Sequence, residues 1–188
     1  MERIYLSIGQ RFDDDISKHA KITHETTTGG GKITISFSGE SEAEILNRIF
    51  LIISHLAKLK DHLKNLYISK GGKGNVIENE VNQSEHLKLI IDLDNLEKHG
   101  SKKNGRSGKN PCIGNPRRGL GPKIYAGSQS GSFLFNPFTG DYNADNVAII
   151  ITAEIKDDKG NTICYLDELI NKALQKWKEV IKTHKLIP

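Results

Sequence analysis

The stretch that decides the fold is "SEAEILNRIFLIISHLAKLKDHLKNLY", residues 41–67. Its apolar residues recur at intervals of three and four, a spacing that places them on one face of an α-helix. They are Ile45, Ile49, Ile52, Leu56, Leu59, Leu63 and Leu66. Ser41 followed three positions later by Glu44 is a capping-box signature, and the "KGGKGN" at 70–75 is a helix breaker. The stretch therefore predicts one long amphipathic helix from Ser41 to about Tyr67.

Two further segments show the same helical spacing. The first is "YLDELINKALQKWKEVIKTHKLI", residues 165–187, which carries Asp167 and Glu168 where the first turn is expected. Its apolar positions are Leu166, Leu169, Ile170, Ala173, Leu174, Trp177, Val180 and Ile181. The second runs from Asn82 or Ser84 to His99 and ends at Gly100. It would bury Leu89, Ile90, Leu93 and Leu96. We expect this helix to lie antiparallel to the helix at 41–67, after a flexible connection of roughly 15 residues.

Strand signals are fewer. "KITISFSG" at 32–39 alternates, and "NVAIIITAEIKDDKGNTICYL" at 146–166 predicts a hairpin that turns at "DDKGN". "KIYAG" at 123–127 and "SFLFN" at 132–136 are candidate short strands. Residues 3–22 fit a helix or a strand, and we favour a helix. The sequence thus predicts an α+β fold, a single domain over residues 1–188 in which three to four helices form a bundle that carries a small antiparallel β-sheet.

Composition sets the class of protein. The 188 residues are 36% hydrophobic and 27% charged, which is typical of a folded chain with a real core. The opening "MERIYLSIGQRFDDD" mixes charges with apolar residues and does not match a signal peptide, and the runs "IFLII" and "VAIII" are far shorter than a membrane span. Two isolated cysteines, Cys112 and Cys164, favour a reducing compartment. We expect a cytoplasmic protein with no membrane partner.

Positive charge is concentrated in one Gly-rich segment, "KHGSKKNGRSGKNPCIGNPRRGLGPK" at 98–123, which we call the basic segment. It contains eight basic residues and no acidic one. They are Lys98, Lys102, Lys103, Arg106, Lys109, Arg117, Arg118 and Lys123. Because the whole chain is +4 and the segment +8, the remainder is −4. The segment is either a solvated loop without a specific role or a loop that binds the phosphates of RNA or another polyanion.

One set of polar residues has a spacing that suits chemistry. Asp92, Asn95 and His99 are three and four apart, so a helix places them on one face. His99 would lie at the negative end of the helix dipole, which favours its imidazolium form, and Asn95 one turn earlier could orient it. Such a pair could move protons on a phosphodiester. The competing interpretation is that His99 only caps the helix and that Asn95 bonds Asp92 or water.

Metal and cofactor signals are weak. His55 and His62 are seven residues apart, which puts them about 10 Å apart along a helix at 1.5 Å per residue, too far to chelate one ion by themselves. Neither "TTTGGGKIT" nor "GRSGKN" has the residues of a nucleotide-binding phosphate loop. We therefore expect no metal and no cofactor.

Three segments carry a family resemblance: "SHLAKLKDHLKNL" at 54–66, "LIIDLDNLEKHG" at 89–100 and "ALQKWKEVI" at 173–181. They are similar to a group of small uncharacterised bacterial proteins and, more loosely, to the HEPN superfamily of helical bundles found in toxin–antitoxin and anti-phage systems. Active HEPN ribonucleases pair an arginine with a histidine four to six residues later, and two copies cut RNA across a homodimer without metal. Asn95 and His99 match the polar position and the histidine. The arginine position holds Asp94, an anion that would repel the substrate.

Three functional hypotheses follow. The first is a HEPN-like bundle that binds RNA or another polyanion through the basic segment without strong catalysis, as part of a toxin–antitoxin or anti-phage module. The second is a metal-independent endoribonuclease that uses Asn95 and His99 across a homodimer, with an arginine from Arg106, Arg117 or Arg118. The third is an accessory module whose helical face binds a partner protein, with no nucleic acid involved.

Overall fold

The computed structural model describes residues 20–27, 30–37, 39, 41–100, 105–122, 132–135, 142–145 and 147–186. The chain divides into two compact units, one from residues 1–45 and 118–151 and the other from residues 46–117 and 152–188. That the whole chain forms a single domain stays a prediction. Within the described residues the fold is α+β, with four helices and a three-stranded antiparallel sheet, as the sequence predicts.

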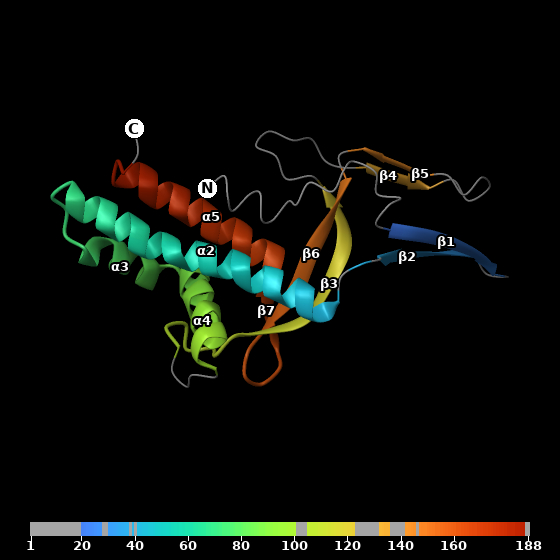
Figure 1. Cartoon of the computed structure of the whole chain (residues 1–188), viewed down its shortest axis with the longest axis horizontal. Coiled ribbons are helices and arrows are strands. Elements are labelled where there is room, and N and C mark those ends of the chain that lie inside the picture. The colour runs from blue at the N-terminus through green and yellow to red at the C-terminus, as the bar shows by residue number, and fades with distance from the viewer. Residues whose placement is uncertain are drawn as a thin grey trace. The chain divides into compact units, whose positions relative to one another are not determined.

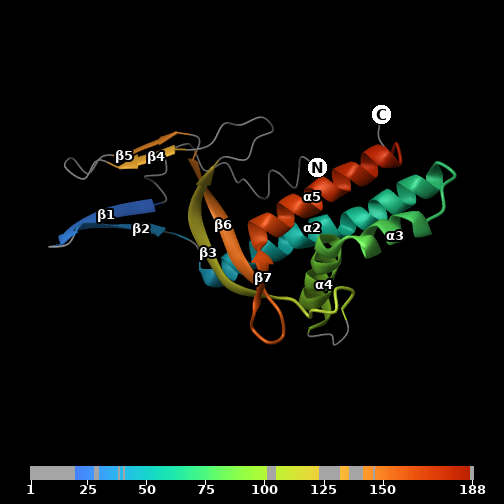
Figure 2. The same ribbon diagram turned by 180° about the vertical axis from the view of Figure 1, so that it is seen from behind.

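The two long helices are α2 (Glu42–Ser69) and α5 (Leu166–Thr183). The capping box is confirmed, since the Ser41 N–H donates to Glu44 Oε2 at 2.7 Å and the Glu44 N–H donates to Ser41 Oγ at 3.3 Å. Figures 1 and 2 show α2 and α5 side by side, with their C-terminal ends at the same end of the bundle. Trp177 of α5 is fully buried, and its indole N–H donates to the Leu56 carbonyl of α2 at 3.2 Å.

The connection after α2 differs from the prediction. Residues 75–83 are not a flexible linker but a third helix, α3 (Asn75–Gln83). It turns back along α2, and Glu78 on α3 lies 3.6 Å from Lys60 and 3.4 Å from Lys64 on α2. The antiparallel neighbour of α2 is thus α3. Only Ile77 and Val81 of α3 are buried, too few positions for the apolar period to show in the sequence.

The helix that ends in the polar triplet is α4 (Glu85–His99). Ser84 is its N-cap, since the Ser84 hydroxyl accepts a hydrogen bond from the Leu87 N–H at 3.3 Å. Gly100 ends it with a positive φ of 69°, which glycine adopts without the steric cost of a side chain. Most of its middle is buried, from Leu87 to Asp94 with Lys88 half-buried, so α4 has no broad polar face there.

The three-stranded sheet has the order β3 (Cys112–Pro122), β6 (Val147–Lys156) and β7 (Thr162–Tyr165). The β6–β7 hairpin is confirmed: Ile155 pairs with Cys164, and the turn is closed by a hydrogen bond from the Gly160 N–H to the Asp157 carbonyl at 3.0 Å. The prediction that residues 98–123 form one Gly-rich loop is wrong for residues 112–122, which are strand β3. Glycine and proline disfavour a strand locally, and only pairing with β6 makes one here.

Two hairpins complete the described chain. Strand β1 (Ala20–Thr27) pairs antiparallel with β2 (Gly30–Phe37), and β4 (Ser132–Phe135) pairs antiparallel with β5 (Tyr142–Asp145). Strands β2 and β4 confirm the signals "KITISFSG" and "SFLFN". The predicted helix over 3–22 is wrong at 20–22, which belong to β1, and the rest of it lies outside the described residues. The candidate strand at 123–127 lies outside them too.

Candidate functional site

Asp92 is buried on α4, with 6% of the residue exposed, and its carboxylate binds the beginning of the basic segment. It accepts hydrogen bonds from the Arg106 N–H at 2.7 Å, from the Ser107 N–H at 2.7 Å and from the Ser107 hydroxyl at 2.6 Å. Gly105 passes so close that a Cβ there would lie 2.6 Å from Asp92 Cγ. We call this arrangement the Asp92 clamp. The sequence predicted Asp92 on one helix face with Asn95 and His99, but in the structure its carboxylate is bound by two backbone N–H groups and one hydroxyl.

Asp94 is also buried, and it forms an ion pair within its own helix. Lys98 Nζ lies 2.5 Å from Asp94 Oδ2, and 8% of the Asp94 side chain is exposed. The other oxygen, Oδ1, is buried without a hydrogen-bond partner in the described structure. Asp94, which the resemblance to HEPN proteins would place at the arginine position, is thus a largely buried carboxylate paired with a lysine of the basic segment.

Asn95 and His99 lie toward the end of α4. Asn95 is half-buried and His99 is exposed. Within the described part of the chain neither side chain forms a hydrogen bond, so the structure brings neither of them to Asp92. His99 precedes the glycine that ends the helix, as predicted, and the Gly100 N–H donates to the Leu96 carbonyl at 2.9 Å.

Acidic side chains of α3 and α4 meet two further cations of the basic segment. Arg106 Nη1 lies 3.0 Å from Glu78 Oε2 and 3.4 Å from Asn82 Oδ1. Lys109 forms an ion pair with Glu85. Burial by itself would raise the pKa of Glu78, but the hydrogen bond from Arg106 and the charge of Lys60 hold it below its usual value. The hydrogen bond from Lys109 lowers the pKa of Glu85.

The remaining cations of the basic segment differ in how exposed they are. Arg117 on β3 is exposed, and its positive charge contributes to lowering the pKa of Glu154, after the larger effect of the hydrogen bond from Lys156. Arg118 is half-buried. Lys102, Lys103 and Lys123 lie outside the described residues. Among the predicted phosphate-binding residues that the structure describes, Arg117 is exposed and forms no ion pair.

The basic segment also contacts the β6–β7 turn, which the sequence did not indicate. Asn110 Nδ2 donates to Asp158 Oδ2 at 3.1 Å, and a shallow open depression lies beside Gly108 and Lys109. Asp157 in its wall accepts from the Lys159 and Asn161 N–H groups at 2.9 and 2.8 Å, so it holds its own turn. The only signal for this contact was composition, since both segments are rich in the residues of tight turns.

Among the described residues, the side chains that could bind a metal or act as a nucleophile do not form a further site. In the described residues no three side chains of His, Cys, Asp or Glu gather as metal ligands. Burial, and then the charge of Glu168, raise the pKa of Cys164 to about 11, so its thiol is protonated and unreactive at neutral pH. None of the described helices is long and apolar enough to cross a membrane.

Comparison with known proteins adds no relative. No family model, no curated protein and no solved structure matches the chain. The HEPN resemblance of residues 54–66, 89–100 and 173–181 therefore stays a prediction.

Proposed function

We propose that this chain is a HEPN-like helical protein that binds single-stranded RNA through its basic segment and does not cleave it. The observation that carries the proposal is the Asp92 clamp. It anchors Arg106 and Ser107 on α4, so a segment with eight cations and no anion starts from a fixed position rather than from a free loop. Anchoring lowers the entropy that the segment would lose when it binds a polyanion.

The ion pairs of the basic segment are compatible with binding. The Arg106 and Lys109 side chains are 36% and 40% exposed, and the Lys98 side chain is 40% exposed. The Lys109–Glu85 pair joins two exposed side chains and contributes only about 0–1 kcal/mol, whereas the partner of Lys98 is the buried Asp94. A phosphate backbone that approaches several of these cations at once competes with such pairs and releases its own counterions. The acidic partners then position the cations without removing them from the surface.

The same geometry argues against cleavage. The cation that a ribonuclease needs beside the scissile phosphate would have to come from Arg106, Arg117 or Arg118. Asp94 occupies the arginine position of the motif, and an anion beside the scissile phosphate would repel it. Asp92 is engaged by three donors and is not placed to exchange a proton with a substrate.

RNA binding is tested by its salt dependence. We expect the affinity for a single-stranded oligoribonucleotide to fall steeply as NaCl rises, because phosphate contacts release counterions. Arg117→Gln should make the slope of log K against log salt shallower by about one unit. Lys58→Gln, at an exposed lysine of α2, is the matched control and should leave the slope unchanged. Binding that does not depend on salt, or equal slopes for the wild type and Arg117→Gln, would contradict the proposal.

Cleavage is tested separately. Purified protein incubated with the same RNA in EDTA should leave it intact, and His99→Ala should change neither this result nor RNA affinity. Cleavage by the wild type that resists EDTA and disappears in His99→Ala would establish the ribonuclease hypothesis instead. A dimer in analytical ultracentrifugation would accompany it, since one Asn95 and one His99 provide half of a site.

A further inference from the structure

The C-terminal ends of α2 and α5 meet at the end of the bundle remote from β7 (Figure 1). Lys70 Nζ, just after α2, donates to the Lys185 carbonyl at 3.1 Å. The Tyr67 and His184 rings lie edge to face, with centroids 5.4 Å apart and planes at 63°. These two contacts bring the residues that follow each helix onto one surface of the unit formed by residues 46–117 and 152–188.

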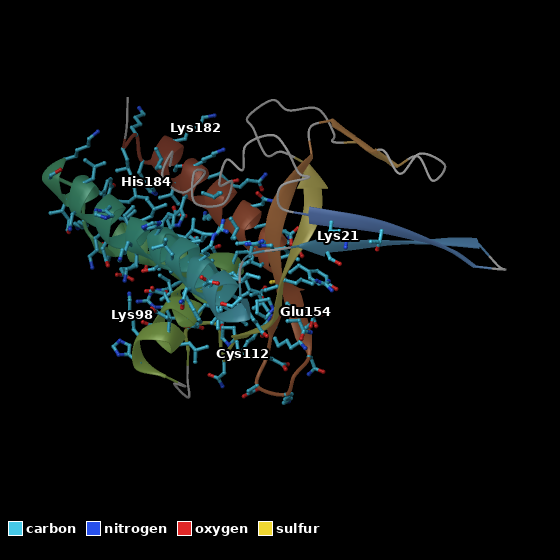
Figure 3. All side chains as sticks on the ribbon, turned by 45° about the vertical axis from the view of Figure 1, so that its right-hand side comes forward. Lys21, Lys98, Cys112, Glu154, Lys182 and His184 are labelled. Carbon is cyan, nitrogen blue, oxygen red and sulfur yellow. The ribbon has the colours of Figure 1, made fainter. Side chains whose placement is uncertain are left out.

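Four exposed lysines lie in the last turn of α5 or directly after α2 and α5. They are Lys70, Lys73, Lys182 and Lys185, and we call them the bundle-end lysines; Figure 3 labels Lys182 beside His184. Among the described residues none of the four forms an ion pair. Glu80 already has partners, since Lys176 Nζ lies 2.7 Å and His184 Nε2 lies 2.9 Å from its carboxylate oxygens. Glu179, one turn before Lys182, is exposed and offsets one charge at most.

Helix dipoles account for only part of this charge. Each helix end carries the equivalent of roughly −0.5 elementary charge, so α2 and α5 together contribute about −1 at this surface. Four lysines exceed that amount even after Glu179 is counted. The lysine charge therefore exceeds what the helix ends and Glu179 offset, and the surplus is available to an external anion.

We propose that the bundle-end lysines are a second phosphate-contact surface for single-stranded RNA, separate from the basic segment. This inference rests on the proposed RNA binding. Lysine ammonium groups are point charges that contact phosphates without reading sequence, which suits a backbone contact. A lipid surface fits less well, because a helix that binds a membrane interface presents a broad apolar face. The one large exposed apolar side chain near these lysines, among the described residues, is Ile68.

The deciding variant is Lys73→Gln with Lys182→Gln, which removes two charges and no observed contact. We expect the slope of log K against log salt for RNA to become shallower by about two units. Lys21→Gln with Lys58→Gln, at two exposed lysines elsewhere, is the matched control and should keep the wild-type slope. If Arg117→Gln weakens RNA binding and the bundle-end variant does not, this inference fails, and RNA binding by the basic segment is retained. If the reverse holds, the bundle end is the RNA surface and the basic segment is not. If the wild type binds no RNA, both fail.

A lysine footprint locates the contact directly. In the intact 188-residue chain, bound RNA should protect Lys70, Lys73, Lys182 and Lys185 from an amine-reactive reagent, read by mass spectrometry, and leave Lys21 and Lys58 reactive. Equal reactivity with and without RNA would overturn the inference. Vesicles containing phosphatidylserine are the competing probe, and protection by vesicles without protection by RNA would identify a membrane surface and overturn it too.

Discussion

Asp92 and Asp94 stand two positions apart on α4 and are equally buried, yet their surroundings differ. Asp92 receives three hydrogen bonds from residues 14 and 15 positions later, whereas Asp94 pairs with Lys98 one turn away. A buried carboxylate is tolerated when donors replace the water that it loses. For Asp92 these donors are two backbone N–H groups and one hydroxyl, all from residues 106 and 107. The burial of Asp92 is therefore tolerated only if this segment lies against α4.

Replacing Asp92 should therefore destabilise the fold. Asp92→Ala leaves the Arg106 and Ser107 N–H groups without their acceptor, and we expect it to lower the free energy of unfolding by about 2–4 kcal/mol. Asp61→Ala, at an exposed aspartate of α2, should change it by about 0.5 kcal/mol or less. Urea denaturation measures both. Equal stability of Asp92→Ala and the wild type would show that the clamp does not hold the segment.

Trp177 is a buried apolar residue whose replacement should also destabilise the fold. It is fully buried, and Trp177→Ala should cost about 3–5 kcal/mol as a large core truncation. Trp177→Phe retains most of the apolar contact but loses the bond to the Leu56 carbonyl, so it should cost less. Because the chain has one tryptophan, native emission should be blue-shifted and should shift to the red on unfolding. Emission typical of water-exposed indole in the native protein would contradict this burial.

At the scale of elements, Ser84 separates α3 from α4. Its backbone is extended, with φ of −105° and ψ of 115°, so it ends one helix and caps the next. Figure 2 shows that α3 follows α2 whereas α4 runs in another direction, and α4 carries the Asp92 clamp. Without this break, residues 75–99 would form one continuous helix of about 25 residues. Neither the contacts of α3 with α2 nor the Asp92 clamp on α4 would then form.

Ser84→Ala should lower the free energy of unfolding by about 0.5–2 kcal/mol, because the Leu87 N–H loses its acceptor. Ser84→Asp provides an equally good N-cap and should retain most of the stability. Hydrogen exchange should show the loss at the first turn of α4. Faster exchange in both variants alike would mean that the side-chain cap is not what stabilises this turn.

At the scale of the whole molecule, charged contacts join segments far apart in sequence. Glu80 on α3 binds Lys176 on α5 and His184 just beyond it. The hydrogen bond from Lys176, and then that from His184, lower the pKa of Glu80 below 4.5. A carboxylate whose pKa is lower in the folded state stabilises the fold above its unfolded pKa, and this stabilisation is lost as the pH falls through the folded value.

Glu80→Gln should therefore be less stable than the wild type at pH 7, by on the order of 1 kcal/mol. The gap should close as the pH falls below 4.5, where the wild-type carboxylate takes up its proton. Glu179→Gln, at an exposed glutamate of α5, is the control and should show little difference at any pH. Denaturation between pH 7 and pH 3 measures the difference in stability between Glu80→Gln and the wild type. A difference that does not change with pH would show that the charge of Glu80 does not stabilise the fold.

The sequence by itself determined α2, α5 and α4, because apolar period, caps and breakers act within a few residues of each other. It also indicated the β6–β7 hairpin through its turn, and Trp177 as a core residue. The tertiary structure decided the rest. Helix α3 has only two buried positions, and β3 is a strand because β6 pairs with it.

The site shows the same division. The spacing predicted that Asp92, Asn95 and His99 share one helix face. It does not predict which of these side chains another segment of the chain buries. Residues 105–107 cover Asp92, and Glu78 and Glu85 receive Arg106 and Lys109. The bundle-end lysines come together because α2 and α5 end at the same place. Each of these contacts joins residues at least 14 positions apart, so only the folded chain specifies them.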